Sequence, residues 1–469
     1  FKQKTAYEIY QCDWSSDVCS SDLMETFLIR ALQLIMSLSL LVIIHEGGHF
    51  LFARLFKTRV EKFCLFFDPW FTLFKFKPKN SETEYGIGWL PLGGYVKIAG
   101  MIDESMDTEQ MKQPMQPWEF RAKPAWQRLL IMIGGVLFNF LLALFIYSMI
   151  LFAWGDEYVP LQKAPLGMDF NETAKSIGFR DGDILVSADG VPFERYGGDM
   201  LTSIVDARQV SVLRNGQEVS VYIPEDMMER LLADSVRFAS FRYPFVIDSI
   251  MPGQPAALAG LQPGDSITQL DGRNIAYFDF KEEMLNRQKA ANDSTSRLLT
   301  LTYVRAGVAD TVKLTTDSLY QIGVAASLQT NKLLPVVKKE YSFFASIPAG
   351  VTLGVNTLKG YVSQMKYLFS KEGAKQLGGF GTIGSIFPAT WDWYQFWYMT
   401  AFLSIILAFM NILPIPALDG GHVLFLIYEI VARRKPSDKF MERAQMVGMF
   451  LLFGLLIWAN FNDVLRFFF

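Results

Sequence analysis

The amino-acid sequence predicts a polytopic α-helical membrane protein with about four spans, and an α+β region between the second span and the third. The chain has 469 residues, of which 51% are hydrophobic, and its mean hydropathy of +0.20 is high for a soluble protein of this length. Its apolar residues gather in four runs near the ~20 residues that a spanning helix needs. Between about residues 155 and 394, strand-like segments instead alternate with turn dipeptides, which is typical of folded soluble domains.

The four expected spans cover residues 24–50, 129–154, 393–432 and 443–461. The third is expected to be broken, because Pro414 and Pro416 interrupt its apolar run. Non-helical backbone at membrane depth is tolerated only where it is buried in protein or lines a cavity, so the break points to a cavity.

Basic residues near the span ends predict the orientation. The loop at residues 51–128 and the short loop between the last two spans both carry Lys and Arg, so both are expected to be cytoplasmic. The long segment between the second and third spans then lies on the outer side. Its last part, residues 334–392, is amphipathic and predicts an interfacial segment, with a plain linker as the alternative. The net charge of −3 gives no argument for nucleic-acid binding.

Residues 1–23 are expected to be a non-native tail. They show no apolar period and no signal-peptide pattern, and residues 17–23 resemble a translated sequencing adapter. Two of the three cysteines, Cys12 and Cys19, lie in this tail. Cys64 alone remains, which excludes a disulfide framework and a zinc site built from cysteines.

The outer segment contains an internal near-repeat. Residues 178–190 and 260–272 both read as a turn ending in Gly-Asp, a strand and an Asp-Gly turn. This pattern resembles PDZ domains and predicts two tandem PDZ-like α+β domains, at 155–240 and 241–333. Such domains bind an extended peptide at a sheet edge. A purely structural pair of β-rich modules is the alternative.

All three histidines lie in two motifs inside apolar, membrane-length segments, His45-Glu46-Gly-Gly-His49 and Leu-Asp419-Gly-Gly-His422. Ionisable groups at that depth are costly, and they usually face one another or a wet cavity. On a helix, His-Glu-x-x-His places two imidazoles on one face with the glutamate beside the first. That glutamate can take a proton from water as the water attacks a carbonyl. The motifs therefore predict a zinc hydrolase with its active site inside the bilayer.

A catalytic zinc typically takes three protein ligands and leaves a fourth position open. His45 and His49 supply two, and Asp419 is the best placed acid for the third. Glu429, about three turns further along the same helix, is its rival. By its spacing from Asp419, His422 is also a candidate ligand, but we favour a supporting role for it. A chance match of His-Glu-x-x-His on an ordinary helix is the remaining alternative, and its position at the end of a span argues against it.

Two asparagines in the spans are candidate substrate-binding residues. Asn411 lies one turn before the break of the third span, and Asn139 lies in the second span. Each amide can donate a hydrogen bond to a substrate backbone or to a developing oxyanion. Each can instead tie helices together, and for Asn139 this second role is slightly favoured.

Residues 83–89 and 92–98 read as two strands joined by turn residues. Helical backbone shields a scissile carbonyl, so a protease acting in lipid must unwind its substrate. A sheet edge at Gly94, Tyr95 and Val96 could hold the unwound strand by main-chain hydrogen bonds. The alternative is a small cytosolic hairpin with no role in substrate binding.

In combination, these motifs resemble the site-2 intramembrane metalloproteases. The resemblance is carried by His45-Glu46-x-x-His49, Gly135-x-x-x-Asn139 and Asn411-x-x-Pro-x-Pro-x-Leu-Asp419-Gly. The sequence Pro-Leu-Gly-Gly-Tyr-Val-Lys at residues 91–97 and the tandem PDZ-like modules narrow it to the bacterial regulator of sigma-E protease group. It covers nearly everything from Met24 onward.

The resemblance implies a site-2 protease core in which one zinc ion is held by His45, His49 and Asp419, with Glu46 as the general base. It also implies that Asn411 helps to position the substrate, and that a membrane-associated β-hairpin around Tyr95 clamps it. The usual Gly-x-Gly of the loop after the first span is absent, and Phe-Phe-Asp-Pro-Trp stands near its place at residues 66–70. The conformation of that loop is therefore open.

Such proteases reside in the bacterial inner membrane and act in stress responses, with their PDZ domains on the periplasmic side. They cut single-span substrates such as anti-sigma factors after a first external cleavage, and they clear remnant signal peptides. The PDZ pair is thought to act as a size filter. Two other functions remain as alternatives, an intramembrane metal transporter and an inactive scaffold that presents PDZ modules. A transporter needs no base beside a ligand, and an intact metal triad argues against an inactive scaffold.

Overall fold

The computed structural model describes residues 16–79, 81–91, 93–101, 113–233, 237–290, 297–327, 333–367, 370, 373 and 377–468. The chain forms two compact units. The helical unit comprises Phe1–Gly155 and Glu340–Phe469, and the β unit comprises Asp156–Lys339. Of the expected non-native tail, residues 1–15 lie outside the described residues, and residues 16–23 begin the first helix.

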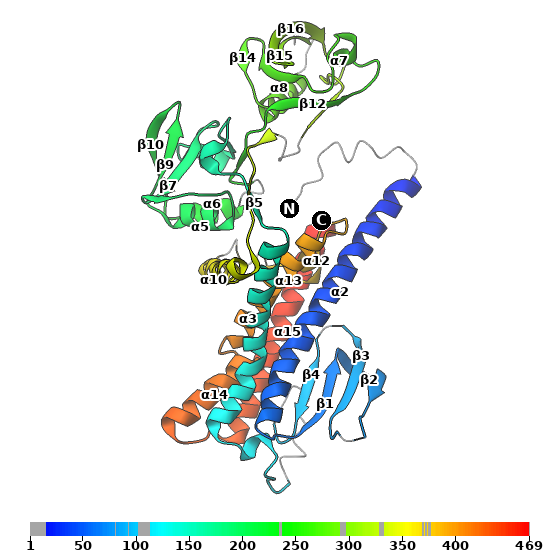
Figure 1. The fold of residues 1–469 in the computed structure, drawn as a ribbon, viewed down its shortest axis with the longest axis vertical. Coiled ribbons are helices and arrows are strands. Elements are labelled where there is room, and N and C mark those ends of the chain that lie inside the picture. Colours follow the sequence, from blue (N-terminus) through cyan, green and yellow to red (C-terminus); the bar gives the residue numbers. More distant parts are fainter. Residues whose placement is uncertain are drawn as a thin grey trace. The chain divides into compact units, whose positions relative to one another are not determined.

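Within the described residues, four helices are long and apolar enough to cross a membrane (Figure 1). They are α2 (Ser16–Leu55, with its span at Met24–Leu55), α3 (Ala125–Ala153), α13 (Trp393–Ile412) and α15 (Asp438–Phe468, with its span at Lys439–Arg466). The chain is therefore a multi-pass membrane protein. Helix α3 is central, because it packs against α2, α13, α10 (Phe343–Met365) and the shorter helix α14 (Asp419–Ala432).

The third span is broken as the prolines predict. Helix α13 ends at Ile412, and α14 begins at Asp419 after a non-helical stretch in which Ala417 has a φ of 78°. Glycines let this stretch lie close to its neighbours. A Cβ on Gly420 would stand 2.1 Å from the Leu413 carbonyl oxygen. A Cβ on Gly448 of α15 would stand 1.7 Å from the Pro416 carbonyl oxygen. The break therefore lies against protein at these two points, and its residues Ala417 and Leu418 line a cavity.

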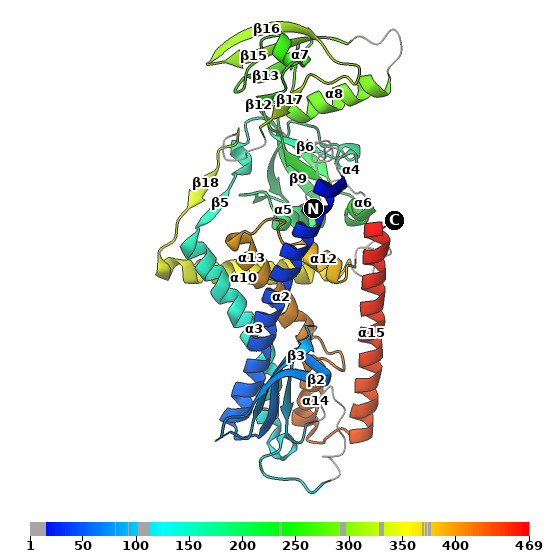
Figure 2. The ribbon, with the colours of Figure 1, turned by 90° about the vertical axis from the view of Figure 1, so that its right-hand side faces the viewer.

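Two helices of the helical unit run across the spans instead of along them, α10 (Phe343–Met365) and α12 (Phe380–Ser385) (Figure 2). Helix α10 packs on α3 through glycine: a Cβ on Gly350 would stand 2.3 Å from Ser148 Oγ. Phe343 also contacts Phe152 of α3, whereas Phe344 and Val351 of the same helix are exposed. The interfacial segment expected at residues 334–392 stays a prediction, and residues 337–339 within it form a strand of the β unit.

A four-stranded sheet follows the first span, with its strands in the order β2-β3-β1-β4. The strands are β1 (Val60–Leu65), β2 (Phe67–Phe76), β3 (Glu84–Leu90) and β4 (Tyr95–Ile98), and a short 3-10 turn (Phe120–Ala122) follows before α3. The predicted pairing of the strand at 83–89 with that at 92–98 is wrong, because β1 lies between β3 and β4. The hairpin of this sheet is β2-β3. Leu92 of the predicted hairpin lies outside the described residues.

The pairing differs from the prediction because β1 carries no flanking turn signal. Only Phe66, with a φ of 67°, separates β1 from β2, and β1 then pairs in parallel with β3, about twenty residues away. Parallel pairing needs a long connection, and periodicity within one strand does not report it.

The β unit consists of two β-rich halves. The first half contains a sheet of order β10-β9-β7-β8 and the pair β11-β6, and the second contains a sheet of order β16-β15-β13-β12-β17 with β14 beside β13. The pair β5-β18 joins the entering and leaving ends of the unit.

The strands and helices of the first half are β5 (Asp156–Tyr158), a 3-10 turn (Leu161–Lys163), β6 (Met168–Phe170), α4 (Glu172–Ser176), β7 (Ile184–Ala188), β8 (Val191–Pro192), α5 (Gly198–Asp206), β9 (Gln209–Arg214), β10 (Gln217–Tyr222), α6 (Met227–Ala233) and β11 (Ala239–Phe241). Those of the second half are β12 (Phe245–Ile250), α7 (Pro255–Leu258), β13 (Ser266–Leu270), β14 (Arg273–Asn274), α8 (Tyr277–Lys289), β15 (Leu298–Arg305), β16 (Val308–Thr315), β17 (Val324–Ala326) and β18 (Val337–Lys339).

The near-repeat in the sequence is also a repeat in backbone conformation. Gly182 and Gly264, which precede β7 and β13, both have a φ of 91°. At the other ends of these strands, Asp189 and Asp271 have φ values of 47° and 50°. Glycine tolerates this left-handed region without strain, and Asp tolerates it better than most residues.

Candidate metal centre

His45 and His49 occupy successive turns of α2, where that helix packs against α3. Both side chains are buried, and their Nε2 atoms lie 3.3 Å apart with the rings nearly perpendicular. A spacing of four residues places two side chains on one helix face, one above the other. Helix geometry therefore accounts for the first two members of the site.

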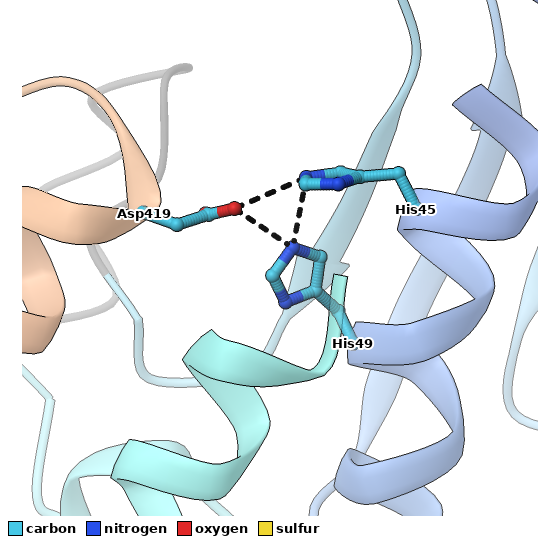
Figure 3. Close-up of side chains that lie close together, drawn as sticks. All are labelled: His45, His49 and Asp419. Atoms are coloured by element: carbon cyan, nitrogen blue, oxygen red, sulfur yellow. Dashed lines mark hydrogen bonds and ion pairs between the residues drawn. The ribbon is translucent and has the colours of Figure 1, made fainter. Parts of the chain in front are cut away.

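Asp419 is the first residue of α14, directly after the break of the third span. Its Oδ2 atom lies 3.1 Å from His45 Nε2 and 3.4 Å from His49 Nε2 (Figure 3). The partial positive charge at a helix N-terminus favours a carboxylate there. The broken span thus delivers an acid from a distant part of the sequence to the two histidines.

The donor set suits a divalent cation. The ligand atoms of the three side chains all lie within 4.8 Å of one another. Within the described residues, no other group of three His, Cys, Asp or Glu side chains lies close enough to share a metal ion. His49 Nδ1 lies 2.8 Å from the carbonyl oxygen of Ile131, which only accepts, so Nδ1 carries the proton and Nε2 presents a lone pair. Asp419 Oδ2 is buried and makes no hydrogen bond of good geometry within the described residues. Two nitrogens and one oxygen facing one another fit a tetrahedral zinc site with one open position.

Gly135 of α3 leaves room for both imidazoles. A Cβ at this position would lie 2.4 Å from His49 Nε2 and 2.7 Å from His45 Cε1. A neighbouring glycine pair, Gly48 and Gly134, brings α2 and α3 into close contact, since a Cβ on Gly48 would stand 2.3 Å from the Gly134 carbonyl oxygen. Small residues at such contacts are characteristic of helix packing in membranes.

A cavity of about 580 Å³ opens beside the three side chains. Its wall includes Glu46, Asn411 and the edge strand β4, together with apolar side chains such as Met132 and Leu90. A largely apolar cavity with a few convergent polar groups is the usual form of a binding site.

A family model for peptidase family M50 matches residues 33–455, which include both halves of this site and both units. The chain belongs to peptidase family M50. The match covers most of the 469 residues, so it concerns the whole fold and not one motif.

Curated relatives extend over nearly the full length of this M50 protein. The regulator of sigma-E protease RseP of Salmonella typhimurium is 27% identical over 456 residues, covering 92% of this chain and 97% of the relative. The metalloprotease MmpA of Caulobacter vibrioides is 25% identical over 460 residues, covering 94% and 96%. Relatives from Neisseria meningitidis and Vibrio cholerae carry zinc metalloprotease in their names. The M50 protein is accordingly a zinc metalloprotease, and the sequence-based predictions of a hydrolase and a zinc cofactor are confirmed.

The structure separates the candidate ligands of the M50 protein. Glu429, the rival of Asp419, is paired with Arg128, whose Nη2 lies 2.5 Å from Glu429 Oε1. His422 lines the cavity but is not a member of the three-residue group. Of the two asparagines, Asn411 lines the cavity, with Nδ2 3.4 Å from His45 Nε2. Asn139 is fully buried, and its side chain faces His45 Nδ1 at 3.3 Å.

Gly94, Tyr95 and Val96 all line the cavity. Sequence reasoning missed a further wall residue, Asp68, which stands in the region where the usual Gly-x-Gly is absent. Its carboxylate accepts hydrogen bonds from the Tyr95 hydroxyl at 2.9 Å and from the Thr72 hydroxyl at 2.8 Å. Burial opposes ionisation of Asp68, but these hydrogen bonds prevail and hold its pKa below the ordinary range. The absence of Gly-x-Gly at residues 66–70 was the sequence feature that could have pointed to Asp68.

Proposed function

We propose that this protein is an intramembrane zinc endopeptidase in which His45, His49 and Asp419 hold the metal and Glu46 is the general base. The observation that carries the proposal is the convergence of Asp419 Oδ2 on both histidine Nε2 atoms, at 3.1 and 3.4 Å, inside a set of membrane-length helices. A transporter reading is disfavoured by membership of a peptidase family.

Glu46 is placed to move a proton. It follows His45 on α2 and lines the cavity beside the proposed ligands. When bound, zinc would supply Lewis acidity that polarises a carbonyl and makes water a better nucleophile. Glu46 would accept the proton of the attacking water and later donate it to the leaving amine.

Asn411 would orient the substrate. Its Nδ2 atom reaches the cavity from the last turn of α13, immediately before the break, on the same side as His45 Nε2. An amide there can donate to the carbonyl oxygen of the scissile bond or of a neighbouring residue. The same donor would stabilise negative charge as it develops on that oxygen.

The edge strand β4 would hold the unwound substrate. In the part of the chain that the structure describes, β4 pairs with β1 alone, so its other edge is not covered by a strand. Its residues line the same cavity as Glu46. A peptide added to this edge would be extended by its main-chain hydrogen bonds, next to the proposed metal.

The two halves of the β unit would act as tandem PDZ-like domains on the outer, periplasmic side of a bacterial inner membrane. Supporting this are the repeated turn conformations around β7 and β13 and the pattern of basic residues in the other loops. As a size filter, the pair would admit substrates that have lost their outer domain. The substrates would be single-span proteins, such as anti-sigma-factor-like proteins, and remnant signal peptides.

The proposal is tested by co-expressing a truncated single-span reporter with wild type and with Glu46→Gln. The substitution keeps size and polarity but removes the base, so cleavage should fall by at least ~100-fold. Glu442→Gln is the matched control, because Glu442 is an exposed acid of α15 away from the cavity, and it should cleave as wild type does. Equal cleavage by Glu46→Gln and wild type would remove the assignment.

A further inference from the structure

The side chain of Asn139 is the feature from which a further role can be derived. It is fully buried on α3, and it is not among the residues that line the 580 Å³ cavity. A contact with substrate therefore has no support in this geometry. Its backbone carbonyl, not its side chain, ties helices together, since Ser404 Oγ of α13 donates to it at 2.7 Å. The side chain itself is left to serve another partner.

That partner is His45, whose Nδ1 atom lies 3.3 Å from the Asn139 amide. The other ring nitrogen, Nε2, faces Asp419 and His49, so it is the atom that would bind the metal. A neutral imidazole that presents a lone pair at Nε2 must carry its proton at Nδ1. Nδ1 then needs an acceptor, because an unpaired donor buried at this depth is costly.

The amide of Asn139 can supply this acceptor. Its Oδ1 atom is buried and has no hydrogen-bond partner among the described residues. The amide oxygen and nitrogen exchange places by a half-turn about the last side-chain bond, so the surrounding network decides which atom faces the ring. With Oδ1 toward His45, the orphaned acceptor and the orphaned donor satisfy each other.

His49 shows the same arrangement with a different acceptor. Its Nδ1 is paired with the carbonyl oxygen of Ile131, also on α3. Ile131, Gly135 and Asn139 are spaced four residues apart, and they therefore share one face of α3. The first and last residues hold the outer nitrogens of the two imidazoles, and Gly135 leaves space for the rings between them.

We infer that Asn139 is a positioning residue, which accepts a hydrogen bond from His45 Nδ1 and so fixes the tautomer and direction of that ring for zinc. The inference rests on the proposed metal site. Groups in this position typically change metal affinity by 10–100-fold when they are removed. The effect should therefore appear in zinc binding itself, before any substrate is added.

The experiment measures zinc content and chelator-competition affinity of the purified full-length protein in detergent. Asn139→Leu removes the acceptor at similar volume and should weaken zinc binding by ~10–100-fold. Asn139→Asp keeps a stronger acceptor and should retain wild-type affinity or better. Ser404→Ala is the matched control, because it removes a buried interhelical hydrogen bond at the same residue but leaves the His45 contact intact. It should keep its zinc.

Three outcomes would overturn the inference. Wild-type zinc affinity in Asn139→Leu together with a changed KM would indicate substrate binding instead. Equal zinc loss in Asn139→Leu and Ser404→Ala would indicate general packing. Zinc loss in Asn139→Asp, which keeps an acceptor, would contradict the inference even if the leucine variant failed to fold. His45→Ala separates this inference from the proposed site: if that variant binds zinc as wild type does, the site itself is wrong.

Discussion

Asp265 in the β unit and Asp419 in the helical unit are both withdrawn from solvent, but they face different partners. The side chain of Asp265 is 1% exposed, and Arg305 holds both of its oxygens at 2.7 Å. Asp183, in the first half of the β unit, is likewise 1% exposed and is held by Arg214 at 2.7–2.8 Å. In each case the same guanidinium also donates to a turn carbonyl, that of Gly260 or Gly178.

In the part of the chain that the structure describes, no lysine or arginine is paired with Asp419. The Nε2 atoms of His45 and His49 lie close to its Oδ2, and neither ring carries a permanent charge. A buried carboxylate is costly unless it is paired or coordinates a metal. The β unit therefore carries its compensating charges in its own sequence and fixes its turns with them, whereas the helical unit leaves a place for an ion. By this comparison Asp183 and Asp265 are structural acids, whereas Asp419 is the proposed metal ligand.

The largest effect expected from this comparison follows from removing the carboxylate of Asp419. Asp419→Asn should reduce zinc content and lower reporter cleavage by more than ~100-fold, because an amide is a poor zinc ligand. Without zinc, the variant should be at least as stable as the metal-free wild type, since it no longer buries an uncompensated charge. Elemental analysis, the reporter assay and thermal unfolding measure the three properties. A metal-free variant clearly less stable than metal-free wild type would place Asp419 among the structural acids.

Removing the metal should change hydrogen exchange in the helical unit but not in the β unit, within the same preparation. A zinc chelator should abolish cleavage and increase hydrogen exchange around residues 45–49 and 419–422, because binding to the native state stabilises it by mass action. Exchange in the β unit should stay unchanged, since its two buried acids, Asp183 and Asp265, are paired with arginine. Added zinc should restore both activity and protection. Increased exchange throughout the β unit would show that it also depends on the ion.

The two arginine-paired acids predict a stability effect of intermediate size. Arg214→Met leaves Asp183 buried without a cation and should destabilise the first half of the β unit by about 3 kcal/mol. Arg305→Met should cost less, because Arg305 is 36% exposed against 17% for Arg214, and water can replace more of its contacts. Hydrogen exchange of each half in the full-length protein measures the local free energy of unfolding. A larger loss in Arg305→Met would contradict the ordering by exposure.

Sequence reasoning located the proposed metal ligands because ionisable residues stand out in apolar segments. His45 and His49 lie on one face by helix geometry alone, and Pro414 and Pro416 mark the break that precedes Asp419. The spans could be found for a similar reason, since length and apolarity are local properties of the sequence.

The strand order around β4 could not be read in this way. It depends on β1, which precedes β3 in the sequence, pairing between β3 and β4. A pattern within one strand does not indicate which strand pairs with it. The direction of the Asn139 side chain also depends on how α2 and α3 pack. Gly47 shows the converse: a glycine inside the His-Glu-Gly-Gly-His motif suggests a close helix contact, but a Cβ there would meet nothing within 4 Å.

The smallest expected effect is the pH dependence that distinguishes a paired acid from an unpaired one. The hydrogen bonds from Arg305 hold the pKa of Asp265 below its ordinary value. Because the folded pKa lies below the unfolded value of about 4, the stabilisation is complete above that pH and is lost as the pH falls through the folded pKa. The second half of the β unit should therefore weaken on acidification below about pH 4. In Arg305→Met this dependence should flatten, since the donor that lowers the pKa is gone. Pulse-labelling hydrogen exchange, with unfolding at each pH and labelling at a common pH, measures how the free energy of unfolding depends on pH in wild type and in Arg305→Met. Equal pH dependence in the two proteins would show that Arg305 does not set the acid response.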